Sequence, residues 1–238
     1  NTEFLEFLLG QKYDFNYKND EGRTLLHAAV SPDVNSSNED KAQKEYDSKI
    51  RATEFLLKQK VDVNAVDNLG VTPLLEAVGG DAIALLKKLK RQSDKIATKR
   101  EDISSLSDSE ELNKMIREYE KELEEGRKRI AKINSFNLPF EKITTILLQA
   151  GAKVNQKEQV SNFTELHFAV WRHSEPIAKA LVGKGANVNA QDIDGNTPLH
   201  LARNNQSIYN QLIQAKADPK IANKDFLTPY DMATWRID

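Results

Sequence analysis

Cysteine is missing from this chain of 238 residues. Its absence excludes disulfide bonds, zinc-thiolate centres and a thiol nucleophile. Because a chain without disulfides suits a reducing compartment, we expect an intracellular location. That location is either the cytoplasm of the cell that makes the protein or the cytoplasm of another cell into which the protein is delivered.

Long apolar runs and an excess of one charge are missing as well. The most apolar stretch, residues 71–86, is interrupted by Glu76 and Asp81 and is shorter than the roughly 18 apolar residues that cross a bilayer. The formal net charge is −2, so the chain as a whole is not attracted to nucleic acid or to an anionic membrane. Gly-rich phosphate loops and the His-Glu-x-x-His and Gly-x-Ser-x-Gly motifs are absent from the sequence. We therefore expect no membrane span, nucleic-acid partner, cofactor, metal or catalytic residue, and no enzyme activity.

A motif that begins with threonine recurs along the chain. Its copies start at Thr24, Thr72, Thr164, Thr197 and Thr228, with spacings of 48, 92, 33 and 31 residues. A period near 33 residues is typical of stacked helix–turn–helix units that are joined by hairpin loops. The two long spacings therefore predict insertions into such units.

The residues of two adjacent segments carry a family resemblance. Thr197–Ala202 (TPLHLA) and the preceding exit turn Gly185–Ala190 (GANVNA) resemble the ankyrin-repeat family. The resemblance implies an all-α ankyrin-repeat solenoid of about five repeats, in which each unit packs only against its neighbours. It further implies a non-enzymatic scaffold that binds another protein.

The first insertion lengthens the second helix of one repeat. Residues 39–60 carry apolar side chains at three-and-four spacing, which predicts one continuous helix. We expect this helix to extend backwards by about three turns, which together with the polar loop before it lengthens the repeat by 15 residues.

The second insertion, residues 81–137, predicts an antiparallel coiled-coil hairpin. Two apolar seams with alternating spacings of three and four residues indicate two helical arms of some 22 residues each. The seams consist of Leu86, Leu89, Ser93, Ile96, Arg100 and Ile103, and of Leu112, Ile116, Tyr119, Leu123, Gly126, Ile130 and Ile133. Ser107 and Glu110 form a capping-box pattern at the start of the second arm.

The insertion divides the chain into three parts: repeats in residues 1–80, the hairpin in residues 81–137, and repeats in residues 138–238. An alternative assignment makes residues 82–89 the second helix of the third repeat and residues 143–148 an extra helix. We prefer residues 143–148 as that second helix, because only they are followed by the exit turn Gly151–Asn155. The first and last repeats are incomplete, so we interpret the chain as part of a longer protein.

Three histidines, His27, His167 and His200, invite a zinc interpretation. They occupy the same position in three different repeats, so stacking would separate them by about 10 Å or more. The family resemblance implies instead that each ring bonds to the threonine three positions earlier and to the backbone of the adjoining loop.

The resemblance also implies where a partner would bind, namely at the hairpin tips and on the exposed side of each first helix. Among these residues Trp171 and Arg172 are the strongest candidates, because such residues dominate binding hot spots. The alternative is that Trp171 packs on the adjoining repeat. The other candidates are Phe163, Asp67, Asn68, Leu69, Ile193, Asp194, Asn196, Asn204 and Asn205.

Basic residues gather near the base of the predicted hairpin. They could form a patch for an acidic protein surface, phosphate or anionic lipid, or they could pair with the neighbouring glutamates, as charges that flank coiled coils usually do. The residues are Lys87, Lys88, Lys90, Arg91, Arg127, Lys128, Arg129 and Lys132.

Two functions from different classes fit this pattern. The first is a protein-binding scaffold with the hairpin as an additional contact arm. The alternative is a targeting or regulatory region of a larger enzyme or effector whose catalytic part lies outside these residues. Self-association through the hairpin is a further hypothesis.

Overall fold

The computed structural model describes residues 13–31, 39–80, 82–83, 85, 88, 92, 94–98, 106–135 and 140–233. The contacts divide the chain into two compact units, residues 1–79 with 138–238 and residues 80–137. The described residues are helices and loops without strands. Among them, no helix combines the length and the apolar character that a bilayer crossing requires.

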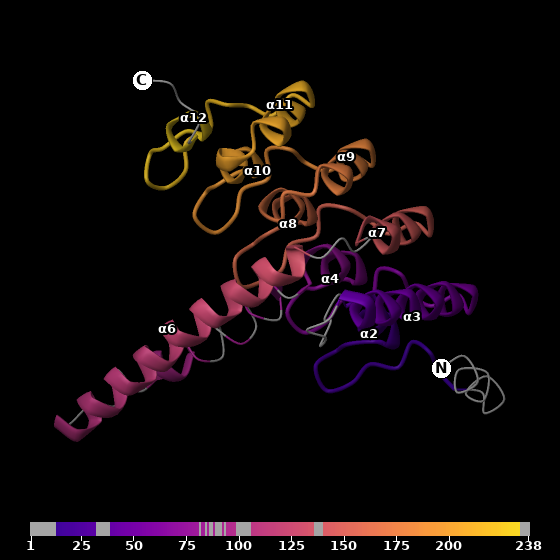
Figure 1. Cartoon of the computed structure of the whole chain (residues 1–238), viewed down its shortest axis with the longest axis horizontal. Helices are drawn as coiled ribbons and strands as arrows, with labels where there is room; N and C mark the ends of the chain where they lie inside the picture. The colour runs from indigo at the N-terminus through magenta and orange to yellow at the C-terminus, as the bar shows by residue number, and fades with distance from the viewer. Residues whose placement is uncertain are drawn as a thin grey trace. The chain divides into compact units, whose positions relative to one another are not determined.

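The first unit consists of two parallel rows of helices (Figure 1). Within each row, every helix packs against the next helix of that row. Between the rows, α2 contacts α3, α4 contacts α7, α8 contacts α9, and α10 contacts α11. The first row comprises α2 (Leu25–Val30), α4 (Pro73–Gly79), α8 (Glu165–Trp171), α10 (Pro198–Leu201, continued by the 3-10 turn η1, Ala202–Asn204) and α12 (Pro229–Met232). The second row comprises α3 (Glu39–Lys58), α7 (Phe140–Gln149), α9 (Glu175–Gly183) and α11 (Gln206–Gln214).

The core of this unit is a column of leucines that the repeat places in register. The first helices α2, α4, α8 and α10 each contribute a leucine that is at most 1% exposed, and each described second helix contributes one that is at most 2% exposed. Each repeat therefore covers the apolar side of the next, as the stability of a solenoid requires. The leucines are Leu26, Leu74, Leu166 and Leu199 in the first row and Leu56, Leu147, Leu181 and Leu212 in the second.

The repeats on the two sides of the insertion are direct neighbours. The Asn64 side-chain oxygen accepts from the backbone N–H of Lys153 at 2.8 Å, and the N–H of Gln159 donates to the carbonyl of Leu69 at 3.0 Å. Helix α4 packs on both α7 and α8. The stack is therefore continuous across some 90 residues of sequence, and α7 occupies the second-helix position of the third repeat.

The threonine–histidine pairs begin the first helices as the resemblance implied. The backbone N–H of Thr164 donates to Nδ1 of His167 at 3.1 Å, and Nε2 lies 3.2 Å from the carbonyl of Asn196 in the next hairpin. Because Nδ1 accepts a hydrogen bond, the neutral ring carries its proton on Nε2 and donates to that carbonyl. His27 and His200 make the equivalent bonds to Val71 and Leu227.

Helix α3 is extended as predicted, with 20 residues compared with 10 in α7. Tyr46 in the extension is 1% exposed. Burial raises the pKa of the Tyr46 hydroxyl, which reaches the backbone of Ile143 on α7. The additional turns are therefore anchored on the next repeat.

The second unit contains the long helix α6 (Leu106–Ser135). Its 30 residues exceed the predicted arm of some 22, and it begins at Leu106, one residue before Ser107, the serine of the predicted capping box. The additional residues are 106–111, before the predicted seam, and 134–135, after it. Two ion pairs lie along this helix, each between residues one helical turn apart. They join Lys121 to Glu125 at 3.8 Å and Lys128 to Glu124 at 3.4 Å. Most of the predicted first arm lies outside the described residues, so the antiparallel pairing stays a prediction.

Candidate protein-recognition surface

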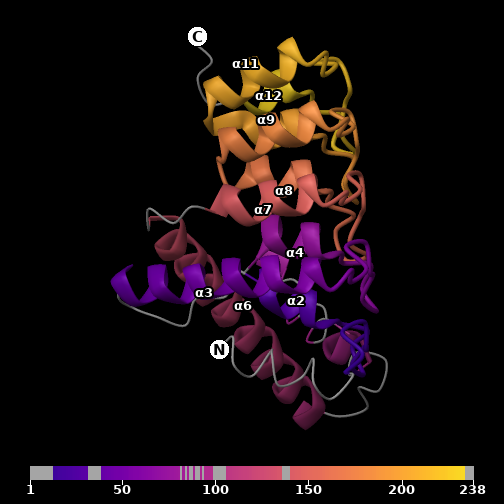
Figure 2. The ribbon, with the colours of Figure 1, turned by 90° about the vertical axis from the view of Figure 1, so that its right-hand side faces the viewer.

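The hairpin tips form one edge of the solenoid (Figure 2). From the second tip onward, the second residue of each tip donates its N–H to a carbonyl of the tip before it. These bonds join the five described tips in a ladder. These bonds run from Asn68 to Glu21 at 2.9 Å, Gln159 to Leu69 at 3.0 Å, Ile193 to Ser161 at 2.8 Å and Lys224 to Asp194 at 2.9 Å. Candidate residues that are far apart in sequence therefore lie along a single edge.

Some of the candidate tip residues face solvent and others shape the turns. Asn68 and Asp194 are exposed, and Ile193 is 47% exposed. Asp67 is buried, and its carboxylate accepts from the N–H groups of Leu69 and Val71 at 2.8 and 2.9 Å. Asp67 therefore holds the tip in place and presents little surface to a partner.

Half-buried candidates occupy the junctions between tips. Leu69 is half-buried. Asn196 is also half-buried, and its side chain lies between Asp192 and the amide of Asn223, which donates to it at 2.8 Å. Both residues contribute to the edge mainly by joining neighbouring repeats.

Phe163 is part of the packing beneath the edge. Its ring stacks on His167 with centroids 5.2 Å apart and meets Phe168 edge-on at 5.1 Å. Of the two asparagines after α10, Asn204 is exposed, while the Asn205 side chain accepts from the N–H of Ile208 at 3.0 Å and begins α11.

Trp171 and Arg172 differ in what they offer to a partner. Trp171, at the end of α8, is 37% exposed. Arg172 is half-buried, and its Nη1 donates to the carbonyl of Val78 on α4 at 3.2 Å. Trp171 therefore presents part of an indole to solvent, next to a guanidinium that joins two repeats.

Sequence reasoning missed Glu158, which occupies the position of Asp67 and Asp192 in other hairpins. Its carboxylate is buried and accepts from the N–H groups of Val160, Ser161 and Phe163 at 2.6–3.1 Å, and from the Ser161 hydroxyl. This hairpin is one residue longer than the others, and the longer side chain spans it. The sequence did hold a signal for this role: glutamate replaces aspartate in the same hairpin in which the loop is one residue longer.

Phe226 was also missed. It lies at the turn position that glycine occupies at residues 22, 70 and 195, has a φ of 63° and is 89% exposed. A positive φ is strained for a bulky residue. An alignment of the hairpins would have singled out this exposed ring.

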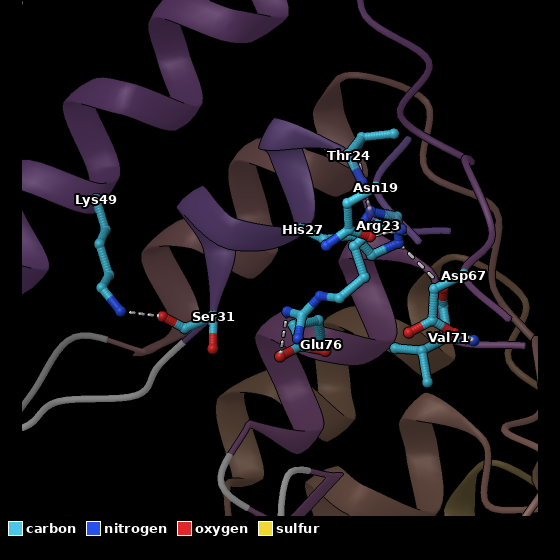
Figure 3. A network of polar contacts seen from close by, with 9 residues as sticks. All are labelled: Asn19, Arg23, Thr24, His27, Ser31, Lys49, Asp67, Val71 and Glu76. Atoms are coloured by element: carbon cyan, nitrogen blue, oxygen red, sulfur yellow. Dashed lines mark hydrogen bonds and ion pairs between the residues drawn. The ribbon is translucent and has the colours of Figure 1, made fainter. Parts of the chain in front are cut away.

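The second and third repeats share a polar network (Figure 3). Arg23 pairs with the buried Glu76 at 3.0 Å, and Lys49 donates to the carbonyl of Ser31. A neighbouring groove of about 570 Å³ is lined by Tyr13, Tyr17 and both cations. Because these cations already have partners, the groove is dominated by two tyrosines with a polar rim.

The structure describes only two side chains of the predicted basic patch. Lys88 is exposed, and Lys128 pairs with Glu124. The side chains of Lys87, Lys90, Arg91, Arg127, Arg129 and Lys132 lie outside the described residues. Both interpretations of the basic patch therefore stay predictions.

The titratable groups beneath the surface serve the fold. Burial lowers the pKa of His167 to about 4, so its ring is neutral near pH 7 and keeps its two structural bonds. Within the described ranges, no three side chains of the metal-binding types lie together.

Comparison with known proteins agrees with this geometry. A family model described as ankyrin repeats, in three copies, matches residues 134–223. The nuclear factor NF-kappa-B p105 subunit of Gallus gallus is 30% identical over 231 residues, covering 93% of this chain and 20% of that protein. The ankyrin repeat and SOCS box protein 6 of Mus musculus is 33% identical over 92 residues, covering 37% of this chain and 22% of that protein. The palmitoyltransferase ZDHHC17 of Danio rerio is 35% identical over 75 residues, covering 31% of this chain and 12% of that protein.

The fold and its surface define a helical-repeat module for protein recognition. The chain belongs to the ankyrin-repeat family, whose repeats are typically non-catalytic interaction modules. It spans between about an eighth and a fifth of the length of these relatives.

Proposed function

We propose that this chain binds another protein through its hairpin tips and the exposed end of α8. The observation that carries the proposal is Trp171, a large aromatic side chain that is 37% exposed at the end of a first helix. Exposed tryptophan is enriched among residues that dominate binding energy. Arg172 is held by its bond to the carbonyl of Val78, which reduces the entropy that this side chain would lose on binding.

The hairpin tips extend this surface along the stack. Ile193, 47% exposed, supplies a second apolar contact, and the exposed Asn68 and Asp194 supply polar ones. Because the ladder fixes the spacing between tips, the partner would meet a rigid row of contacts. Residues 81–137 would act as an additional contact arm.

The exchange Trp171→Ala tests this surface. We expect it to weaken binding of the partner by about 2 kcal/mol, roughly 30-fold. The measurement captures interacting proteins with the intact chain, identifies them, and then titrates the purified partner against both variants by calorimetry.

A matched control is available on the opposite row of helices. Ile213 on α11 is 38% exposed, so Ile213→Ala removes an equally exposed apolar side chain outside the proposed surface. The proposal would be contradicted if Trp171→Ala and Ile213→Ala weakened binding equally, or if neither exchange weakened it.

A second candidate function is that of a targeting or regulatory region within a larger enzyme or effector. It is supported by the small share of the relatives that the chain covers, one of which is named a palmitoyltransferase. Sequencing the complete reading frame separates the two candidates, because a catalytic domain in the same polypeptide would favour the second.

Two further proposals concern the insertion and the location of the protein. Residues 81–137 would mediate self-association if they pair between copies, which sedimentation of the chain with and without them tests. The absence of cysteine supports an intracellular, reducing compartment, which a tagged chain would report by microscopy.

A further inference from the structure

Glu165 is a buried carboxyl group with few hydrogen-bond partners. It is 1% exposed at the first position of α8, where α4, α10 and α12 each have proline. Its Oε2 accepts from the backbone N–H of Asn155 at 3.0 Å, while Oε1 has no hydrogen-bond partner among the described residues. A buried charge is costly unless it is paired or fully hydrogen-bonded.

Other buried carboxylates of the chain are better compensated. Glu76 pairs with Arg23 at 3.0 Å, and Glu158 accepts from three backbone N–H groups. Asp67 accepts from two. Glu165 therefore stands apart as a side chain whose neutral form suits its surroundings better than its charged form.

The bond from Glu165 holds a junction between repeats. Asn155, whose N–H it accepts, has a φ of 73° and reaches the next exit turn with its side chain. Its Nδ2 donates to the carbonyl of Gly185 at 3.1 Å, and its Oδ1 accepts from the N–H of Asn187 at 2.6 Å. The protonation state of Glu165 thus acts on the connection between the third and fourth repeats.

We propose that Glu165 is a proton-controlled joint between these two repeats: its neutral carboxyl keeps the exit turn at Asn155 docked, and its ionisation loosens the turn and the base of α8. Because α8 ends at Trp171, this regulates the surface on which the proposed function rests. The joint itself is a property of the chain without a partner.

The electrostatics agree with the geometry. Burial raises the pKa of Glu165 from 4.5 to about 7, against the opposing effect of the backbone amides of Glu165, Asn155 and Gln156. On the elements packed against α8, the charged and titratable groups are Glu76 on α4, Glu175 and Lys179 on α9, and His200 on α10. Lys157 and His200 act on the neighbouring His167.

The sign of the pH effect follows from linkage. A raised pKa in the folded state contributes stability that is fully present below the unfolded value of 4.5 and is lost as pH rises through about 7. His167, with its lowered pKa, acts in the opposite direction: its contribution is present above 6.5 and is lost as pH falls through about 4. The pH dependence of the wild type therefore mixes two opposing effects, and a comparison with a variant is needed to separate them.

Glu165→Gln replaces the carboxyl with a neutral group of the same shape. We expect the ratio of the unfolding equilibrium constants, wild type over E165Q, to rise roughly 70-fold between pH 5 and pH 8.5. Urea unfolding at several pH values measures this ratio, in which the contribution of His167 cancels. The matched control is Glu175→Gln, the same exchange at an exposed glutamate in the first turn of α9, and the rise for E165Q should clearly exceed the change for this control.

Two direct measurements remain decisive even if E165Q does not fold. Carbon NMR of the wild-type Glu165 carboxyl should titrate with a midpoint near pH 7. The Asn187 amide should lose protection from hydrogen exchange above that pH relative to the Asp218 amide, which makes the equivalent bond to Asn189 at the next junction. A carboxyl midpoint below pH 5, or a ratio that changes less than about threefold, would overturn the proposal.

Discussion

Replacing Phe168 with alanine is expected to lower the free energy of unfolding by about 3 to 5 kcal/mol. The ring is 1% exposed and meets Phe163 edge-on at 5.1 Å, in a helix that packs against α4, α9 and α10. Its removal leaves a cavity where repeats meet, and each repeat depends on its neighbours for stability. Urea unfolding followed by circular dichroism measures the loss.

The equivalent position of the next repeat provides the control. Leu201 is half-buried, so Leu201→Ala should cost clearly less, about 1 to 2 kcal/mol. Equal costs at the two positions, or a cost below 1 kcal/mol for Phe168→Ala, would mean that Phe168 does not hold neighbouring repeats together.

Replacing Glu158 with alanine is expected to cost about 3 kcal/mol, because three backbone N–H groups and a hydroxyl lose their shared acceptor in a part-buried turn. The hairpin at residues 158–163 should lose order first. Its tip connects two others through Gln159 and Ser161, so hydrogen exchange should increase at the amides of Gln159 and Ile193.

Glu158→Gln is the matched variant for this turn. It keeps the length of the side chain and one acceptor oxygen, so it should cost about half as much as the alanine exchange. A loss below about 1 kcal/mol for Glu158→Ala would show that the turn keeps its shape without the carboxylate.

Much of the stack could be predicted from the sequence because its determinants are local. Thr164 and His167 lie three positions apart, and their bond begins the helix wherever the pair occurs. The exit turn at Gly151 identified α7 as the second helix of the third repeat, since a turn and the helix before it are contiguous. Such features depend on neighbouring residues rather than on the next layer.

The environment of individual side chains could not be predicted in the same way. Glu165 takes a position that proline occupies in α4, α10 and α12, and its burial arises from the packing of α8 on elements distant in sequence. The role of Arg172 depends on the carbonyl of Val78, 94 residues away. The exposure of Phe226 depends likewise on what lies beside its hairpin. These properties arise between layers, where sequence spacing carries little information.

The most direct test of the account is a cross-link across the insertion. The side chain of Asn64 accepts from the backbone N–H of Lys153 at 2.8 Å, which brings the two residues within reach of a disulfide. Because the chain has no cysteine, the variant Asn64→Cys, Lys153→Cys can form only this intramolecular bond. Mild oxidation of dilute protein, followed by a thiol assay and gel electrophoresis, should show rapid closure of the disulfide.

The control is the variant Asn64→Cys, Asn187→Cys, which skips one repeat and should stay reduced. Equal rates in both variants would contradict a stack in which the repeats before and after residues 81–137 are adjacent layers.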